Sequence, residues 1–127
     1  MIRVVQFLCA LCFLAALGLV CTLALAPSGS DFGMFAKIDD KVGHFIAFFL
    51  LCLFAYVAFP RLSLAWIFAI LLIMGAAIEF GQTFTGRETS LEDFAANVLG
   101  LMAGALPLAA YRLRQMLNSR TRSKPAA

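Results

Sequence analysis

The residues of this chain that could do chemistry form three short groups, each spaced so that its members share one face of a helix. They are Asp40, Lys41 and His44, then Glu79 and Gln82, and finally Arg87, Ser90, Asp93 and Asn97. Side chains three or four residues apart are neighbours on a helix. Imidazole and carboxyl groups can exchange protons, whereas guanidinium, amide and hydroxyl groups can bind a polar head group. The three groups therefore predict a site for proton transfer or for ligand binding.

Three of these residues are candidates for acid–base catalysis. His44 can accept a proton near neutral pH, and Asp40, one turn before it, could orient the ring. Glu79 stands inside an apolar run and is the candidate acid, and Asp93 is a further catalytic candidate. A head-group hydrolase or transferase would use such groups. No serine or cysteine occupies a recognisable nucleophile turn, so the sequence leaves open whether the protein is an enzyme.

The other polar residues suit ligand binding. Arg87 suits an anion best, because a guanidinium pairs bidentately with phosphate or carboxylate. Further contacts to the same head group are expected from Gln82, Ser90, Asn97, Asp40 and Lys41. His44, Glu79 and Asp93 could hold a metal, but one histidine with two acids is a weak pattern. We therefore assign neither a metal nor a cofactor from the sequence.

Polar residues in a helix bundle also have a purely structural explanation. Hydrogen bonds between membrane helices contribute about 0.6 kcal/mol each on average and need no chemistry. Asp93 could stabilise the positive end of a helix, and Arg87 could neutralise the acids. Helix association alone does not require acids, a histidine, an arginine and amides at one depth. For the group as a whole, a functional site is the preferred hypothesis.

The composition indicates an all-α polytopic membrane protein. The 127 residues are 63% hydrophobic and 13% charged, against about 25% charged in an average soluble domain. This excludes a soluble monomer and a disordered chain. Four apolar runs approach the roughly 20 residues that a bilayer requires: residues 4–26, 42–59, 62–84 and 94–111. We predict a compact bundle of four transmembrane helices over residues 1–111 and a basic tail over residues 112–127.

The amino-terminal run and the cysteines have ordinary explanations. The run over residues 4–26 exceeds the roughly 7–15 apolar residues of a signal peptide, so we expect a retained helix. The cysteines all lie in apolar runs, which excludes a disulfide scaffold and favours small buried side chains. They are Cys9, Cys12, Cys21 and Cys52.

The basic residues predict the orientation of the chain. With four spans both termini share one side of the membrane, and that side has seven cations and no acid. The cations are Arg3, Arg61, Arg112, Arg114, Arg120, Arg122 and Lys124. The positive-inside rule then places both termini in the cytoplasm. The tail is expected to lie along anionic inner-leaflet lipid. Nucleic-acid binding is not expected, because the topology already explains the charge.

The same topology gathers the polar groups into one layer near the outer surface. With a rise of about 1.5 Å per residue, His44 and Asn97 lie about 6–7 Å into their helices. Glu79, near the end of its own run, lies about 9–10 Å below the outer loop. The stripe that contains Asn97 continues inward as Gly100-x-x-x-Gly104, which lets a neighbouring helix approach closely. We therefore expect this stripe to face protein rather than lipid.

In this order and spacing, the three groups resemble the VanZ-like family. The resemblance runs from about Lys37 to Gly104, and its residues read Asp40-Lys41-x-x-His44, Glu79-x-x-Gln82 and Arg87-x-x-Ser90-x-x-Asp93-x-x-x-Asn97. It implies a small multi-pass protein of the bacterial plasma (inner) membrane. The namesake of the family is associated with low-level teicoplanin resistance, and most members have no assigned reaction. Family membership alone does not fix a function.

Our preferred hypothesis is a polar site at the outer leaflet that binds or modifies an envelope lipid, a lipid-linked precursor or an amphiphilic glycopeptide antibiotic, with antibiotic resistance as one implied phenotype. Two alternatives stay open: a proton-coupled transporter that works as a homo-oligomer through Glu79, and a structural bundle without chemistry. Transporters bind near the membrane midplane, so polar groups crowded toward one leaflet disfavour the transporter.

Overall fold

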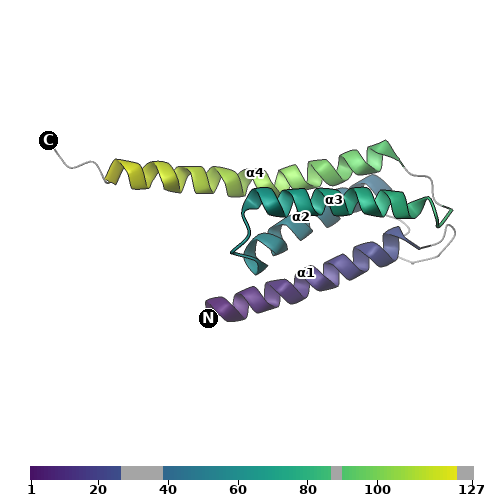
Figure 1. The fold of residues 1–127 in the computed structure, drawn as a ribbon, viewed down its shortest axis with the longest axis horizontal. Helices are drawn as coiled ribbons and strands as arrows, with labels where there is room; N and C mark the ends of the chain where they lie inside the picture. Colours follow the sequence, from purple (N-terminus) through teal and green to yellow (C-terminus); the bar gives the residue numbers. More distant parts are fainter. Residues whose placement is uncertain (27–38, 87–89, 123–127) are drawn as a thin grey trace.

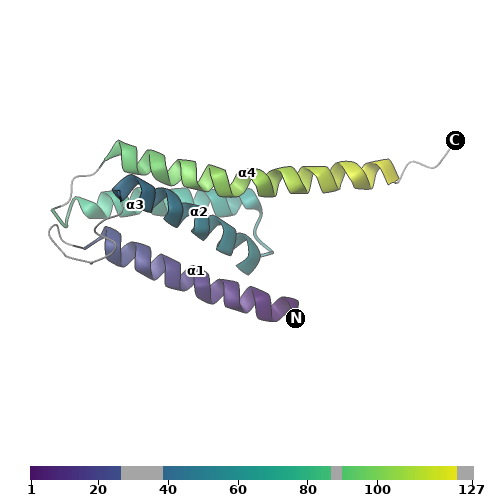
Figure 2. The same cartoon turned by 180° about the vertical axis from the view of Figure 1, so that it is seen from behind.

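The computed structural model describes residues 1–26, 39–86 and 90–122, and these form four helices without a strand. The helices are α1 (Ile2–Ala24), α2 (Asp40–Ala58), α3 (Leu64–Gln82) and α4 (Leu91–Arg122). The amino end of α1 and the carboxyl end of α4 point to one end of the bundle (Figures 1 and 2). The carboxyl ends of α1 and α3 and the amino ends of α2 and α4 lie at the other, which we call the loop end (Figure 1). The predicted all-α fold with four helices is confirmed.

Local signals account for the helix ends. The side chain of Asp39 precedes α2 and accepts a hydrogen bond from the backbone N–H of Lys41 at 3.0 Å. Ser63 precedes α3 in the same way, and its Oγ accepts from the N–H of Trp66 at 3.3 Å. Helix α2 ends shortly before Pro60, because proline cannot continue a helix without breaking its hydrogen-bond pattern.

Helix α4 extends beyond the expected end of the fourth span. It has 32 residues, continues through Pro107 to Arg122, and projects from the bundle (Figures 1 and 2). Pro107 removes the donor that the carbonyl of Ala103 would use, a loss that membrane helices tolerate. Directly after Tyr111, residues 112–117 are all strong helix formers, which favours continuation of the helix. The first part of the basic tail is therefore helical.

All four helices are long and apolar enough to cross a membrane by length and composition. Large apolar side chains cover the outside of the bundle, including Phe7, Trp66, Ile73 and Leu106, each at least 60% exposed. A soluble monomer rarely exposes so much apolar surface. This surface suits contact with lipid, in agreement with a multi-pass membrane protein.

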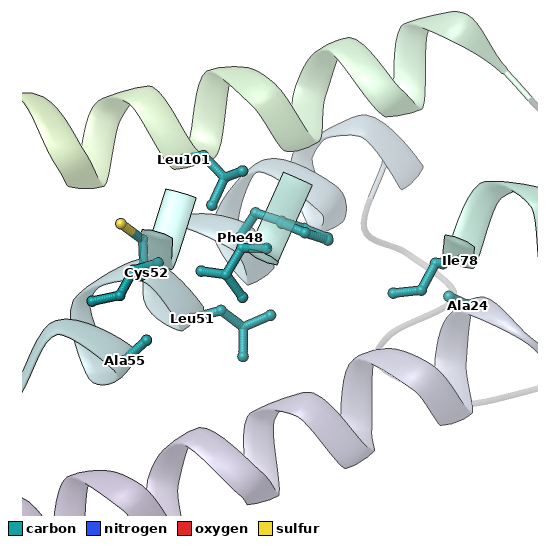
Figure 3. Close-up of a cluster of buried hydrophobic side chains, with 9 residues drawn as sticks. Ala24, Phe48, Leu51, Cys52, Ala55, Ile78 and Leu101 are labelled. Atoms are coloured by element: carbon teal, nitrogen blue, oxygen red, sulfur yellow. The ribbon is translucent and has the colours of Figure 1, made fainter. Parts of the chain in front are cut away.

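Helix α2 is the central element, since its contacts with α4 and with α1 are the most extensive in the bundle. The core follows α2 and its neighbours (Figure 3): Ala24, Phe48, Leu51, Cys52, Ala55, Ile67, Leu71, Ile78 and Leu101. Helix α1 is peripheral, and Ala24 is its only buried residue. The Phe13 ring of α1 packs edge-on against Phe59, with 5.5 Å between centroids.

The glycine pair of α4 brings this helix against α2, as predicted. A Cβ at Gly100 would overlap the carbonyl oxygen of Phe45. A Cβ at Gly104 would lie 3.0 Å from the Cβ of Cys52 and 3.2 Å from the carbonyl oxygen of Phe49. The two backbones are therefore too close for larger residues, and the stripe that contains both glycines faces protein.

The four cysteines are free thiols, as the sequence predicts. Cys52 is buried in the core, which fits the expected role of a small apolar side chain. Cys12 is exposed on α1, so the expectation of burial is wrong for this residue. The reason is the peripheral position of α1, which leaves most of its surface uncovered.

Candidate functional site

Polar side chains from three helices are buried together at the loop end of the bundle. Those with at most 8% exposure are His44, Glu79, Gln82, Asp93 and Asn97. Glu79, Asp93 and Asn97, together with the exposed Asp40, lie close to the His44 ring. We call this group the His44 cluster: Asp40, His44, Glu79, Asp93 and Asn97.

The centre of the cluster is a hydrogen bond between α2 and α4. Nδ1 of His44 donates to Oδ1 of Asn97 across 2.9 Å, and both residues are buried. An amide oxygen only accepts hydrogen bonds, so the proton of a neutral ring is on Nδ1 and the lone pair is on Nε2. Asn97 thus orients His44, a role that the sequence assigned to Asp40.

Helix α3 contributes Glu79 to the same ring. Its Oε1 lies 3.8 Å from Nδ1 of His44, which is too long for a hydrogen bond but close enough for charge attraction. Within the described residues, neither carboxylate oxygen of Glu79 has a hydrogen-bond partner, and the same holds for Nδ2 of Asn97 and Oε1 of Gln82. Buried polar atoms normally have partners, so each of these four atoms needs an explanation.

Two aspartates complete the cluster. One oxygen each of Asp40 and Asp93 and one ring nitrogen of His44 all lie within 4.8 Å of one another. Asp93 is buried in the first turn of α4, where the positive end of the helix favours a carboxylate. Asp40 is exposed, so the cluster opens to the surroundings on its side.

A glycine of α3 gives Asn97 its space. A Cβ at Gly75 would lie 3.3 Å from Nδ2 of Asn97 and 3.3 Å from the Phe48 ring. The sequence analysis did not single out this residue. The available signal was its spacing, because Gly75 stands four residues before Glu79 and therefore shares its helix face.

The structure gives Gln82 a different contact from the expected one. Its Nε2 donates to the carbonyl oxygen of Ala24 across 3.1 Å and so joins the end of α1 to α3. The last carbonyls of a helix lack intrahelical donors, and this bond satisfies one of them. The amide nitrogen of Gln82 is therefore committed to helix packing, and only its Oε1 remains for a ligand.

Two other predicted ligand residues act at helix ends. Oγ of Ser90 accepts from the backbone N–H of Glu92 at 3.1 Å, so Ser90 helps to start α4. Lys41 pairs with Glu92 on the exposed surface and links α2 to α4 beside the cluster. Arg87, the predicted anion-binding residue, lies outside the described residues.

The cluster combines groups of complementary chemistry. It offers a lone pair on the His44 ring, an unpaired amide donor on Asn97 and carboxylates from three helices. Such a set can accept a proton, donate to an acceptor or coordinate a cation. Among the described residues, the buried polar side chains lie at the loop end, whereas a cluster of buried apolar side chains packs between the helices (Figure 3).

Comparison with known proteins identifies the family of the chain. No curated protein and no solved structure matches the chain. A family model described as VanZ/LLP1 matches residues 7–113, which cover α2 and α3 completely, most of α1 and α4, and every residue of the His44 cluster. The chain therefore belongs to the VanZ/LLP1 family and is a VanZ-like membrane protein.

Proposed function

We propose that this protein binds the head group of an envelope lipid or lipid-linked precursor at the His44 cluster, on the outer face of the bacterial plasma membrane. Both termini are then cytoplasmic, in keeping with the seven cations that the expected topology places on their side of the membrane. The observation that carries the proposal is the set of buried polar atoms without partners on Glu79 and Asn97.

These unpaired atoms argue against a purely structural bundle. A buried donor or acceptor without a partner costs about 1–3 kcal/mol of stability. If the bundle had only a structural role, apolar residues in place of Glu79 and Asn97 would remove this cost and make the protein more stable. A ligand that pairs with both residues repays the cost on binding, and the bundle then serves as its receptor.

The position of the cluster favours a lipid as the ligand. It lies at one end of helices whose outer surfaces are apolar, so a lipid chain can lie along the bundle while its head group reaches the cluster. Nδ2 of Asn97 can donate to a phosphate or carbonyl oxygen. Arg87 is close in sequence to Ser90 and supplies the guanidinium that pairs with phosphate.

The apolar centre of the bundle disfavours the transporter alternative. Below the cluster, Phe48, Leu51, Leu71 and Leu101 are at most 1% exposed and fill the space between the helices. Polar cargo would need a path lined by polar groups, and among the described residues the buried ones are gathered at the loop end.

The test compares lipids in cells and on the purified protein. Lipid and peptidoglycan-precursor profiles with and without the gene should differ in one species, and native mass spectrometry should find that species on the purified full chain. Teicoplanin susceptibility is measured in the same strains, so that an antibiotic ligand is detected as well. The proposal fails if no profile changes and the purified protein carries only bulk lipids.

Three variants assign the role of single groups. Arg87→Lys keeps the charge but loses the bidentate fork, so we expect less bound lipid at unchanged membrane abundance. Glu79→Gln removes an ionisable group; if binding persists while turnover stops, the site is catalytic, and if both persist, it is a binding site. Glu92→Gln is the matched control, because this acid is exposed and pairs at the surface.

A further inference from the structure

The His44 cluster has a surplus of negative charge. Asp40, Glu79 and Asp93 contribute three carboxylates. Among the described residues, the cation at this end of the bundle is Lys41, which pairs with Glu92 at the surface. Glu79 is 8% exposed and Asp93 6%. Carboxylates buried in this way need a positive charge or a proton to offset their lost hydration.

The geometry of three of these groups suits a metal ion. A ring nitrogen of His44 and one oxygen each of Asp40 and Asp93 lie within 4.8 Å of one another. Ligands about 2.2 Å from a metal stand at most about 4.4 Å apart, so small side-chain rotations bring all three into contact with one ion. An imidazole combined with carboxylates suits Zn²⁺ or Mn²⁺, whereas Mg²⁺ and Ca²⁺ prefer oxygen ligands throughout.

Two neighbours are arranged like the outer shell of a metal site. Histidines that bind metals almost always donate their second N–H to an acceptor, and Nδ1 of His44 donates to Oδ1 of Asn97. This bond leaves Nε2 as the coordinating atom. Glu79 lies beside the Nδ1 edge of the same ring, with its Oε1 3.8 Å from Nδ1, and within the described residues both of its oxygens lack a hydrogen-bond partner.

We infer that Asp40, His44 and Asp93 bind a divalent transition-metal ion at the open side of the cluster, and that this ion receives the phosphate of the head group. Only the second part rests on the proposed function. The ion offsets the carboxylates and presents positive charge to an anionic ligand, which an acidic cluster alone would repel.

Metal binding is measured on the full chain without phospholipid. The protein is purified in a maltoside detergent, stripped with a chelator and titrated with Mn²⁺, followed by electron paramagnetic resonance, and with Zn²⁺, followed by calorimetry. We expect one ion per chain at micromolar concentration. Asp93→Asn should weaken binding at least about tenfold, and Asn97→Leu by about tenfold through loss of the orienting bond.

The controls separate coordination from folding and from general charge. Glu92→Gln changes the charge by the same amount as Asp93→Asn at the adjacent residue, but its side chain is 70% exposed, so binding should not change. Asp40→Asn alters an exposed ligand and should weaken binding, and the melting temperature of the metal-free variant is measured beside it to show that the protein is folded. The inference is overturned if wild type binds no ion, if Glu92→Gln weakens binding as much as Asp93→Asn, or if Asp93→Asn and Asp40→Asn both bind like wild type.

Lipid binding is then compared in the stripped and the metal-loaded protein, with phosphatidylglycerol nanodiscs as the probe. Tighter binding only after loading supports the bridging role, and the same increase should be absent in Asp93→Asn. If the ion binds but no lipid does, the metal site stands and the proposed function fails. If lipid binds equally well without the ion, the bridging role fails, and Arg87 is sufficient for the phosphate.

Discussion

His44 on α2 and Asn97 on α4 stand 53 residues apart in the sequence, and their side chains share a buried hydrogen bond of 2.9 Å. The bond fixes the tautomer of the histidine and joins two helices whose backbones come close together at Gly100. It also leaves Nδ2 of Asn97 without a partner, so the same residue holds the ring and offers a donor to a ligand. Structural and functional roles therefore meet in one pair of residues.

This pair should show measurable energetic coupling. In a double-mutant cycle of His44→Ala and Asn97→Ala, we expect a coupling energy of about 0.6–1.7 kcal/mol, from the average to the largest value found for hydrogen bonds between membrane helices. The free energy of unfolding is measured in mixed micelles for the four proteins of the cycle. Additive effects of the two substitutions would mean that the bond contributes nothing to stability.

Gly100 should be far more sensitive to substitution than Gly18. A Cβ at Gly100 meets the backbone of Phe45, whereas a Cβ at Gly18 meets nothing within 4 Å. We expect Gly100→Ala to lower the free energy of unfolding by about 1–3 kcal/mol, because a backbone cannot move aside as a side chain can. Gly18→Ala should have no unfavourable effect, since alanine favours the helix. Equal melting temperatures for the two variants would contradict the close contact between α2 and α4.

Gln82 should matter for stability rather than for metal binding. Gln82→Met keeps the approximate size of the side chain and removes the donor to the carbonyl oxygen of Ala24. We expect a loss of about 1 kcal/mol in the free energy of unfolding, the usual net value of such a bond. Metal affinity should stay at the wild-type value, because Gln82 is not a member of the His44 cluster. A large fall in metal affinity at unchanged stability would place Gln82 among the ligands instead.

Tyr56 and Arg112 form a second link between α2 and α4, at the end of the bundle away from the site. Nε of Arg112 donates to the hydroxyl of Tyr56 at 3.1 Å, and the guanidinium lies 4.9 Å from the ring centroid. Tyr56→Phe removes the acceptor but keeps the ring, so we expect less destabilisation than with Tyr56→Leu, which removes both contacts. Thermal unfolding in detergent checks this order, and the reverse order would show that ring stacking is unimportant.

Topology is tested with reporter fusions. The basic residues near both termini lead us to expect a cytoplasmic reporter after Ser119 and external reporters at Ser30 and Thr89. An external reporter after Ser119 would place the His44 cluster at the inner leaflet. The metal measurements would be unaffected by that result, but the outer-face lipid proposal would be wrong.

The sequence by itself determined the class of the molecule. Apolar runs separated by charges are enough to predict four helices, because a bilayer imposes the length and the composition of each span. The spacing Gly100-x-x-x-Gly104 likewise predicted a close helix contact, since small residues at a four-residue interval line one helix face. The polar residues of the site were identified because each is costly inside a membrane.

Only the tertiary structure decided which of these residues meet. Helical spacing shows that Asp40 and His44 share a face, but it cannot show that Asn97 of another helix accepts the hydrogen bond from Nδ1 of His44. It also cannot show that Gln82 turns to α1 instead of the cluster. Such contacts depend on the rotation and depth of each helix relative to its neighbours. Those are set by packing between residues distant in sequence, and no periodicity within one segment encodes them.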